Sequence, residues 1–521
     1  MPSIKWITLL VVAIIIGFGA LGVVLDSINT PSSPNNKRSD YRNLEDESIK
    51  DIILGTDVSI NSSVAYIDSQ YVKEYSLPNG TWPNGILVGR DGMVWTAGSR
   101  SHTLLSFDPE DGQIKSAYPI KEESSSDVMK GGSLMVWSMV EGNDGFIWFS
   151  QFGPDRLWRF DPNTEKFQVF RSISAPPFQM KVDKDTGNIW FTTLTGNTLG
   201  VIQKIENKNE SSPEYKITEF DMDSDSNPSG LFLEKDHVWV SQISNNKLVK
   251  FNVVTDSNDL VIDVVRISEI SSSEGIPIYS PTDLLIQNDN LWFTEHGTST
   301  ITKYQTESQN LTRFPTSANP YQTTTLPFWI REATGGDGHW FNEHTGNRIA
   351  FLNTKGMTLL EYEIPTRPSD GYIVYPLGIA VDPANSNKLW FSEWNTDKIA
   401  VVDLNIPVSF DIFSDTDKIV LSGSNNTADI DVKITRKSFD LSNGSNNIVY
   451  LRASSSMEPA AGFVNVTVNF STDTINFTSN ETTQVYLHLQ NDAAPLGNYT
   501  LAISATDGAV TKSIFLDLIV N

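Results

Sequence analysis

The sequence contains no cysteine in its 521 residues. The protein therefore forms no disulfide bonds and no thiolate metal sites, so its stability must come from packing. Positive charge is also scarce: 38 Lys and Arg residues stand against 63 Asp and Glu residues, giving a formal net charge of −25. Such a surface repels phosphate backbones and anionic headgroups. The composition argues against a nucleic-acid partner, and the charge by itself indicates no more than solubility.

One long apolar run stands near the start of the chain. Residues 6–25 are apolar or small and uncharged, and a helix of that length spans about 30 Å, the hydrocarbon thickness of a bilayer. A cleaved signal has a shorter apolar region, of about 7–15 residues, and a small-x-small cleavage site. We therefore predict an uncleaved transmembrane anchor in residues 1–26, with a cleaved signal as the alternative. The Ser-, Asn- and Pro-containing residues 27–66 read as a flexible linker.

Asn-x-Ser/Thr sequences are frequent, and some arise by chance in a chain rich in Asn and Ser. Dense N-glycosylation is the sharper interpretation, because seven of them crowd into residues 425–498. Together with the anchor they predict a glycoprotein at the cell membrane with its folded part outside. The eleven sites are Asn61, Asn79, Asn209, Asn310, Asn425, Asn443, Asn465, Asn469, Asn476, Asn480 and Asn498.

A repeat built around tryptophan runs through most of the chain. Each unit has four short segments of strand character separated by Gly, Asn and Asp turns, and no unit shows a 3.6-residue apolar rhythm. Units of this kind predict a seven-bladed β-propeller over residues 67–405. The segment YVKEYSLP at 71–78 resembles the fourth strand of other units, so we expect it to complete the last blade and close the ring. The repeated residues are Trp95, Trp148, Trp190, Trp239, Trp292, Trp340 and Trp390.

The tryptophan repeat stops after residue 405. Residues 406–521 contain seven short segments of period-two alternation with turn residues between them, which predicts an immunoglobulin-like β-sandwich acting as a spacer or adhesion surface. The whole chain is thus predicted to be all-β, apart from one N-terminal transmembrane helix.

Three glutamates recur at one position of the repeat. The third residue after the tryptophan is Glu295, Glu343 or Glu393 in the last three units, and is uncharged in the first four. Equivalent positions in neighbouring blades should converge if they face the channel. Three close carboxylates would repel one another and raise at least one pKa unless a cation lies among them. The pattern predicts a site for a hard divalent ion such as Mg²⁺ or Ca²⁺.

A histidine follows two of these glutamates directly. Because adjacent side chains on a strand face opposite ways, His296 and His344 should point away from Glu295 and Glu343. They can be packing residues, or they can be a second ligand or an acid/base group at the mouth of the channel. As catalytic candidates they are the two histidines that we single out.

The unit PLGIAVDPANSNKLWFSEWNTDKIAVVD at 376–403 resembles the repeat of the virginiamycin B lyase (streptogramin lyase) family. The resemblance covers the propeller, roughly two thirds of the chain. It implies a seven-bladed propeller that uses Mg²⁺ to open the ester of a cyclic depsipeptide by elimination. It also implies that Glu393, Glu343 and Glu295 hold the metal and that a histidine in a Pro-His-Gly motif acts as the base.

That histidine is absent. At its place in the motif the chain has Leu377, Phe328 and Thr282, and earlier units have Ser229, Phe178 and Asn84. Proton abstraction needs a positioned base. We therefore predict a membrane-anchored extracellular protein that binds a small-molecule, glycan or protein ligand. The alternative is a Mg²⁺-dependent lyase, or lactone or ester hydrolase, whose base has moved to His296 or His344.

Overall fold

The computed structural model describes the chain from Ser69 onwards, with gaps. The described residues are 69–121, 135–152, 156–171, 173–205, 214–272, 275–318, 324–333, 335–366, 374–423, 426–437, 447–457 and 465–521. Every named element within them is a β-strand, which confirms the all-β prediction. No helix in these ranges is long and apolar enough to cross a membrane. The predicted anchor and linker lie outside the described residues.

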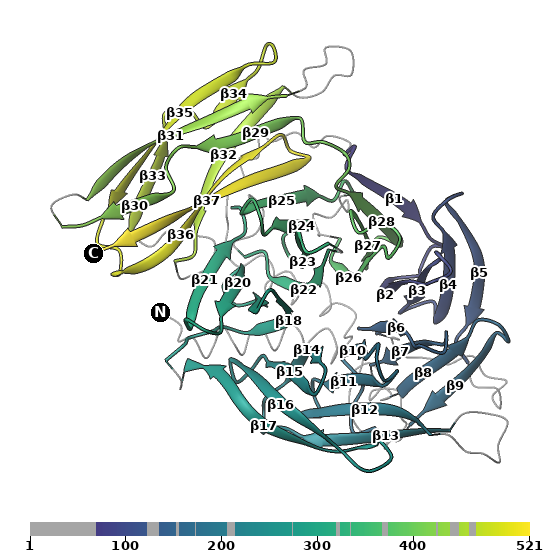
Figure 1. Cartoon of the computed structure of the whole chain (residues 1–521). Coiled ribbons are helices and arrows are strands. Elements are labelled where there is room, and N and C mark those ends of the chain that lie inside the picture. Colours follow the sequence, from purple (N-terminus) through teal and green to yellow (C-terminus); the bar gives the residue numbers. More distant parts are fainter. Residues whose placement is uncertain are drawn as a thin grey trace, which may run out of the picture.

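Four-stranded antiparallel sheets follow one another around a ring, which is the arrangement of a β-propeller (Figure 1). We number them blades 1–7 in chain order. Blade 1 contains β2 (Pro83–Val88), β3 (Val94–Gly98), β4 (Thr103–Asp108) and β5 (Gln113–Pro119), and blade 2 contains β6 (Met139–Glu141), β7 (Ile147–Gln151), β8 (Arg156–Asp161) and β9 (Lys166–Phe170). Blade 3 contains β10 (Gln179–Val182), β11 (Ile189–Thr193), β12 (Thr198–Ile205) and β13 (Glu214–Asp221), and blade 4 contains β14 (Pro228–Glu234), β15 (His237–Gln242), β16 (Lys247–Thr255) and β17 (Val261–Ser271).

The remaining blades have the same order, and the last one takes its outer strand from the start of the described chain. Blade 5 contains β18 (Pro281–Gln287), β19 (Asn290–Glu295), β20 (Thr300–Gln305) and β21 (Asn310–Pro315). Blade 6 contains β22 (Pro327–Glu332), β23 (Gly338–Glu343), β24 (Arg348–Asn353) and β25 (Thr358–Glu363). Blade 7 contains β26 (Pro376–Val381), β27 (Lys388–Glu393), β28 (Lys398–Asp403) and β1 (Val72–Ser76). β1 pairs antiparallel with β28, from Val72 opposite Val402 to Ser76 opposite Lys398. This pairing closes the ring as the sequence predicted.

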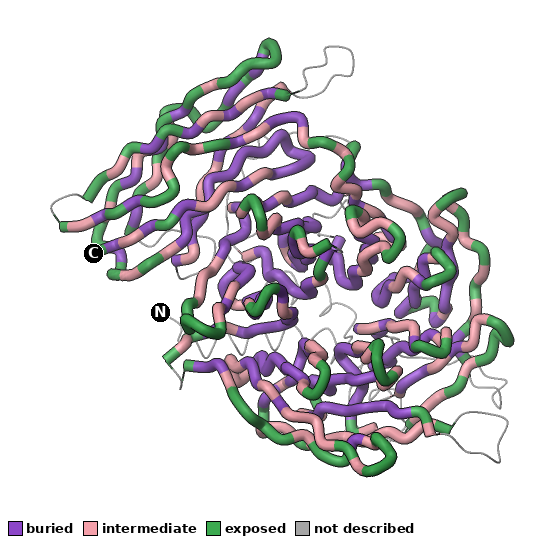
Figure 2. Tube along the Cα trace, in the orientation of Figure 1, coloured by how far each residue is buried: buried purple, intermediate pink, exposed green. Residues whose placement is uncertain are grey.

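The second strand of each blade is the most buried (Figure 2). Its tryptophan packs between neighbouring blades: Trp95 contacts Phe160 of blade 2 at 5.8 Å between ring centroids, and Trp148 contacts Tyr215 of blade 3 at 5.0 Å. The alternating apolar residues of the repeat thus fill the layers between blades.

A polar side chain two residues after the tryptophan links neighbouring blades. Thr192 Oγ1 donates to the Ser229 carbonyl at 2.5 Å, and Ser392 Oγ donates to the Asn84 carbonyl at 2.8 Å across the ring closure. Ser241, Thr294 and Asn342 make the same kind of bond from blades 4, 5 and 6. These bonds tie the second strand of one blade to the first strand of the next, from blade 3 round to blade 1.

The strands after blade 7 form two further sheets. They are β29 (Phe410–Ser414), β30 (Lys418–Leu421), β31 (Thr427–Arg436), β32 (Ile448–Ser455), β33 (Val466–Phe470), β34 (Thr474–Asn476), β35 (Thr482–Asn491), β36 (Gly497–Thr506) and β37 (Val510–Val520). One sheet has the order β29-β31-β35-β33. The other is continuous with blade 6, because β25 pairs with β37 from Thr358 opposite Ile514 to Tyr362 opposite Val510.

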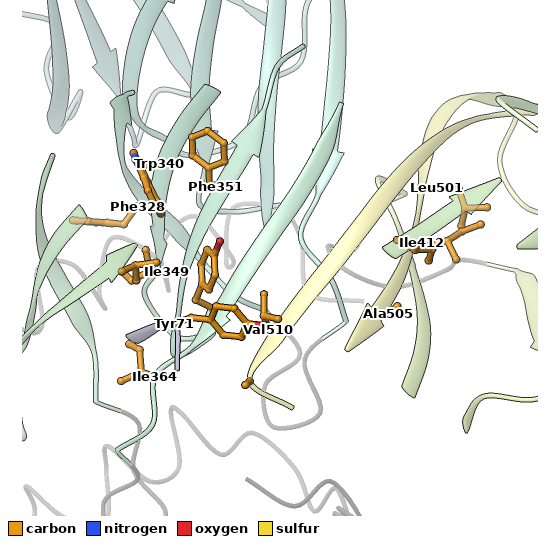
Figure 3. Close-up of a cluster of buried hydrophobic side chains, with 14 of the residues drawn as sticks. Tyr71, Phe328, Trp340, Ile349, Phe351, Ile364, Ile412, Leu501, Ala505 and Val510 are labelled. Carbon is orange, nitrogen blue, oxygen red and sulfur yellow. The ribbon is translucent and has the colours of Figure 1, made fainter. Parts of the chain in front are cut away.

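Apolar side chains cross this junction (Figure 3). Tyr71 and Tyr362 lie 5.7 Å apart, and Val510 belongs to the same cluster. On the other side, Ile412 and Leu501 lie between the two C-terminal sheets. The C-terminal sheets are therefore docked on blade 6 through both backbone pairing and a shared core.

Candidate functional site

The centre of the ring is formed by one residue from the beginning of each blade's first strand. We call these the ring-centre residues, and they occupy the position where the resemblance implies a catalytic histidine. All of them are buried. They are Asn84, Trp137, Phe178, Ser229, Thr282, Phe328 and Leu377.

Three of these side chains are aromatic and meet across the ring. Trp137 lies 5.0 Å from Phe178 and 6.1 Å from Phe328, and Phe178 lies 6.1 Å from Phe328, all between ring centroids. Trp329 adds a fourth ring at 4.5 Å from Phe328 and 5.4 Å from Phe178. We call these four residues the aromatic plug. They replace the expected basic histidine by a packed apolar centre.

Glu295 is held by its own blade. Arg313 Nε donates to Glu295 Oε2 at 2.6 Å and Arg313 Nη2 donates to Oε1 at 3.0 Å, a two-pronged ion pair. The Tyr279 backbone N–H also donates to Oε1, at 2.7 Å. The carboxylate is fully buried, so these donors compensate its desolvation.

Glu343 belongs to a buried cluster of three carboxylates around one arginine. Arg348 Nε lies 2.5 Å from Glu363 Oε1, while Arg348 Nη1 lies 3.6 Å from Glu361 and 3.9 Å from Glu343. Burial, with repulsion from Glu361, raises the pKa of Glu343 well above its usual range, and Arg348 only partly opposes this. Burial at this position therefore favours the protonated form of Glu343.

Glu393 is less well compensated. Thr396 Oγ1 donates to Glu393 Oε2 at 2.8 Å, but the neighbouring Lys398 ammonium pairs with Glu74 at 2.7 Å. Burial and repulsion from Glu74 raise the pKa of Glu393 to about 8. The three glutamates thus have three separate environments, each within its own blade.

The predicted metal site gains no support from this arrangement. In the part of the chain that the structure describes, no group of three or more His, Asp or Glu side chains is placed to hold an ion. Arg313 and Arg348 supply the positive charge that we had expected Mg²⁺ or Ca²⁺ to supply at Glu295 and Glu343.

His296 and His344 lie against the aromatic plug. Their rings are 5.6 and 5.4 Å from Phe328, and 6.3 Å from each other. Both side chains are buried, and neither ring nitrogen of His296 has a hydrogen-bond partner within the described part of the chain. Burial lowers the pKa of His344 to about 4. Burial and the neighbouring His344 lower the pKa of His296 well below its usual range. Burial therefore favours the neutral form of both imidazoles.

A cavity of about 280 Å³ opens at the other end of the ring centre. Pro281 pairs with Glu295, so the first strands begin at the histidine end and run away from it. The cavity is lined by residues that follow the ring-centre position in blades 1, 2, 3, 6 and 7. Among them are Trp137 and Trp329 of the aromatic plug, and the basic side chains Lys181 and Arg331.

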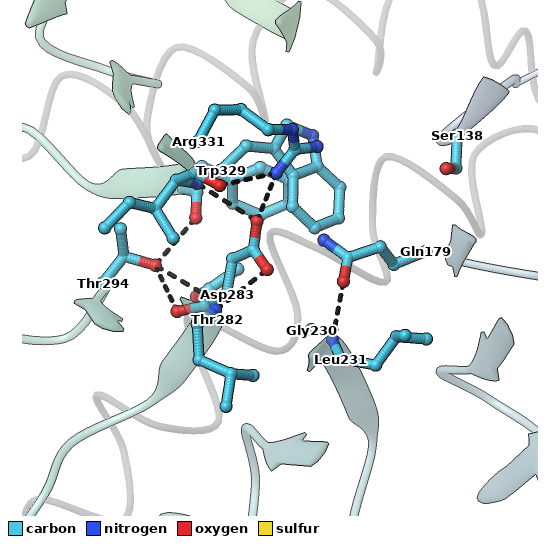
Figure 4. A network of polar contacts seen from close by, with 12 residues as sticks. Ser138, Gln179, Gly230, Leu231, Thr282, Asp283, Thr294, Trp329 and Arg331 are labelled. Atoms are coloured by element: carbon cyan, nitrogen blue, oxygen red, sulfur yellow. Dashed lines mark hydrogen bonds and ion pairs between the residues drawn. The ribbon is translucent and has the colours of Figure 1, made fainter. Parts of the chain in front are cut away.

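Asp283 fixes one of these basic groups (Figure 4). Arg331 Nη1 donates to Asp283 Oδ2 at 2.6 Å, and the backbone N–H of Ile330 donates to the same oxygen at 3.1 Å. The Arg331 guanidinium also lies 5.7 Å from the Trp329 ring centroid. Lys181 has no ion-pair partner among the described residues.

Several of these residues were not predicted from the sequence. The cross-strand register could have indicated Arg348, because it stands opposite Glu343 on the neighbouring strand. Lys398 stands opposite Glu393 in the same way. No comparable signal points to Lys181 or Arg331.

No protein-family model and no curated protein sequence matches this chain. Among solved structures, virginiamycin B lyase from Staphylococcus aureus is 24% identical over 64% of this chain and 99% of its own, with a TM-score of 0.48. A catalytically inactive variant of that lyase with quinupristin is 23% identical over the same shares, also with a TM-score of 0.48. The WD40 β-propeller domain of Doa1 is 8% identical over 65% of this chain and 98% of its own, with a TM-score of 0.45. The neighbours thus include several β-propellers.

Proposed function

We propose that this protein is a non-catalytic binding protein whose propeller recognises a ligand. The observation that carries the proposal is the aromatic plug with its two buried histidines. A general base must reach the proton that it removes and needs a pKa near the working pH. His344, buried behind Phe328 with a pKa of about 4, meets neither condition.

We further propose that the protein is held at the cell membrane by residues 1–26, with the propeller outside and N-glycosylated. Support comes from the apolar run at 6–25 and from the exposure of the described sequon asparagines. These are Asn79, Asn310, Asn465, Asn469, Asn476, Asn480 and Asn498. Enzymatic removal of N-glycans from protein made in its native cells should lower its mass; an unchanged mass contradicts the glycosylation.

Turnover assays on the full chain test the binding proposal against the lyase alternative. We expect no opening of depsipeptide or lactone substrates with or without Mg²⁺. Turnover that disappears in both His296→Ala and His344→Ala would establish the relocated base and overturn the proposal. Turnover that survives both changes would also overturn it, with a base elsewhere.

Calorimetry tests the metal separately. We expect no specific heat of Mg²⁺ or Ca²⁺ binding to the wild-type protein. A saturable heat that is lost in Glu343→Gln would establish the metal site that the sequence predicted and would make these ions part of the function.

A further inference from the structure

The cavity beyond the aromatic plug has aromatic residues in its wall. Trp137 and Trp329 line it and are themselves packed against Phe178, at 5.0 and 5.4 Å between ring centroids. Met139 and Ile379 extend the apolar wall. At about 280 Å³, the space is at the lower limit of small-molecule sites, which are concave and largely apolar with few polar groups.

The charged groups of the cavity do not balance. Arg331 is paired with the buried Asp283 at 2.6 Å. The other partners of this pair are backbone groups: the N–H groups of Leu284 and Ile330 donate to Asp283, and the Ile330 carbonyl accepts from Arg331. Lys181 is the third charged group, and it adds a positive charge that no described carboxylate pairs with. In a chain of net charge −25, this cavity therefore carries a net positive charge.

The charged form of Lys181 is disfavoured in the empty cavity, and a bound anion would stabilise it. Burial and the neighbouring Arg331 lower the pKa of Lys181 to about 8, while Asp283 acts weakly in the opposite direction. An opposite charge within about 4–6 Å favours the charged form of a group. A carboxylate placed between Lys181 and Arg331 would supply this charge, and both cations would donate hydrogen bonds to it.

We propose that this cavity binds a small organic carboxylate, with its acid group between Lys181 and Arg331 and its apolar body against Trp137 and Trp329. This assignment rests on the proposed binding function, and it gives that function a ligand class and a location. The site is separate from the glutamate and histidine positions at the other end of the ring.

The probe that we choose is 2-naphthoate, with neutral 2-naphthamide as its matched analogue. Calorimetry on the full chain at pH 7 should show saturable binding of the acid. The amide should bind at least about tenfold more weakly, because it cannot form charge-assisted bonds with both cations. Equal affinity for acid and amide, or no binding of either, would overturn the proposal.

Variants locate the binding in the cavity. Lys181→Met should weaken naphthoate binding by about tenfold or more, and Lys181→Arg should restore most of it. Lys184→Met is the matched control, because Lys184 is exposed in the turn after the same strand and lies outside the cavity. If Lys181→Met binds as wild type does, or if Lys184→Met loses as much, the assignment is wrong.

The pH dependence gives a second measurement. Burial, with the neighbouring Arg331, lowers the pKa of Lys181 to about 8, so its charge is lost as the pH rises through this range. Affinity should fall between pH 8 and pH 10 in the wild type and stay constant in Lys181→Arg. Failure of these tests leaves the binding proposal standing, since only turnover overturns that one.

Discussion

Blades 1–4 and blades 5–7 use one repeat position in different ways. In the first four blades the third residue after the tryptophan is Gly98, Gln151, Thr193 or Gln242, and in the last three it is a buried glutamate. The order of the strands within a blade is the same in both halves. The uncharged residues can be buried without a charged partner. Each buried glutamate instead has charged or polar partners that its own blade supplies. A repeated carboxylate therefore does not by itself indicate a shared site.

The largest loss of stability is expected from removing Arg348, the cation of the buried cluster in blade 6. Arg348→Met leaves Glu343, Glu361 and Glu363 buried without their cation, so the free energy of unfolding should fall by about 3–5 kcal/mol. Urea denaturation would measure it. Lys355→Met in the same blade removes an exposed pair with Asp337 and should change little. Equal losses in the two variants would contradict the role of the buried cluster.

Two isosteric changes distinguish the glutamates from each other. Glu295→Gln breaks a two-pronged ion pair and should lower the free energy of unfolding by about 2 kcal/mol. Burial and Glu361 raise the pKa of Glu343, which favours its protonated form, so replacing it by the neutral amide in Glu343→Gln should have a much smaller effect. Denaturation at one pH compares them, and a larger loss for Glu343→Gln would show that its carboxylate is ionised.

Glu393 should make stability depend on pH. Its pKa is about 8 in the folded protein, against about 4.5 when unfolded, so the folded state binds more protons between these values. Wild-type stability should therefore fall as pH rises from 4.5 to 8, by at most about 1.4 kcal/mol for each pH unit from this group. The Glu393→Gln variant should not show this contribution to the fall in stability with pH. A difference between the two proteins that stays constant with pH would contradict the raised pKa.

His344 should contribute a pH dependence of the opposite sign, over a narrower range of pH than Glu393. Its folded pKa of about 4 lies below the usual 6.5, so the unfolded state binds more protons in that narrower window. Stability should fall as pH drops from 6.5 to 4, and His344→Phe should remove this contribution while keeping an aromatic ring against Phe328. The measurement is the pH profile of unfolding for both proteins. Identical profiles would mean that His344 is charged or exposed.

The sequence was sufficient for the all-β class, for the propeller repeat and for the closing strand, because these follow from strand periodicity and turn chemistry. It was not sufficient for the cavity. The first strand of blade 5 has a register irregularity between Pro281 and Leu284, and similar irregularities occur in blades 1, 4, 6 and 7. Such a bulge changes which side chains face the centre, so the convergence of Lys181 and Arg331 appears only in three dimensions.

The sequence repeat identifies the three glutamates but not all of the side chains that they contact. Each glutamate ends the second strand of its blade, but Arg313 stands on the fourth strand of blade 5 and Arg348 on the third strand of blade 6. The cross-strand register places Arg348 opposite Glu343, but Arg313 lies one strand further along the chain and no pattern around Glu295 indicates it.

The pairing of β25 with β37 has a consequence for the order of events during synthesis. Val510 leaves the ribosome about 150 residues after its partner Tyr362, which at about 5–20 residues per second is a delay of roughly 7–30 seconds. Throughout that interval the outer edge of blade 6 has no strand beside it. The nascent chain thus has an open β-edge that its own last strand must reach before another chain does.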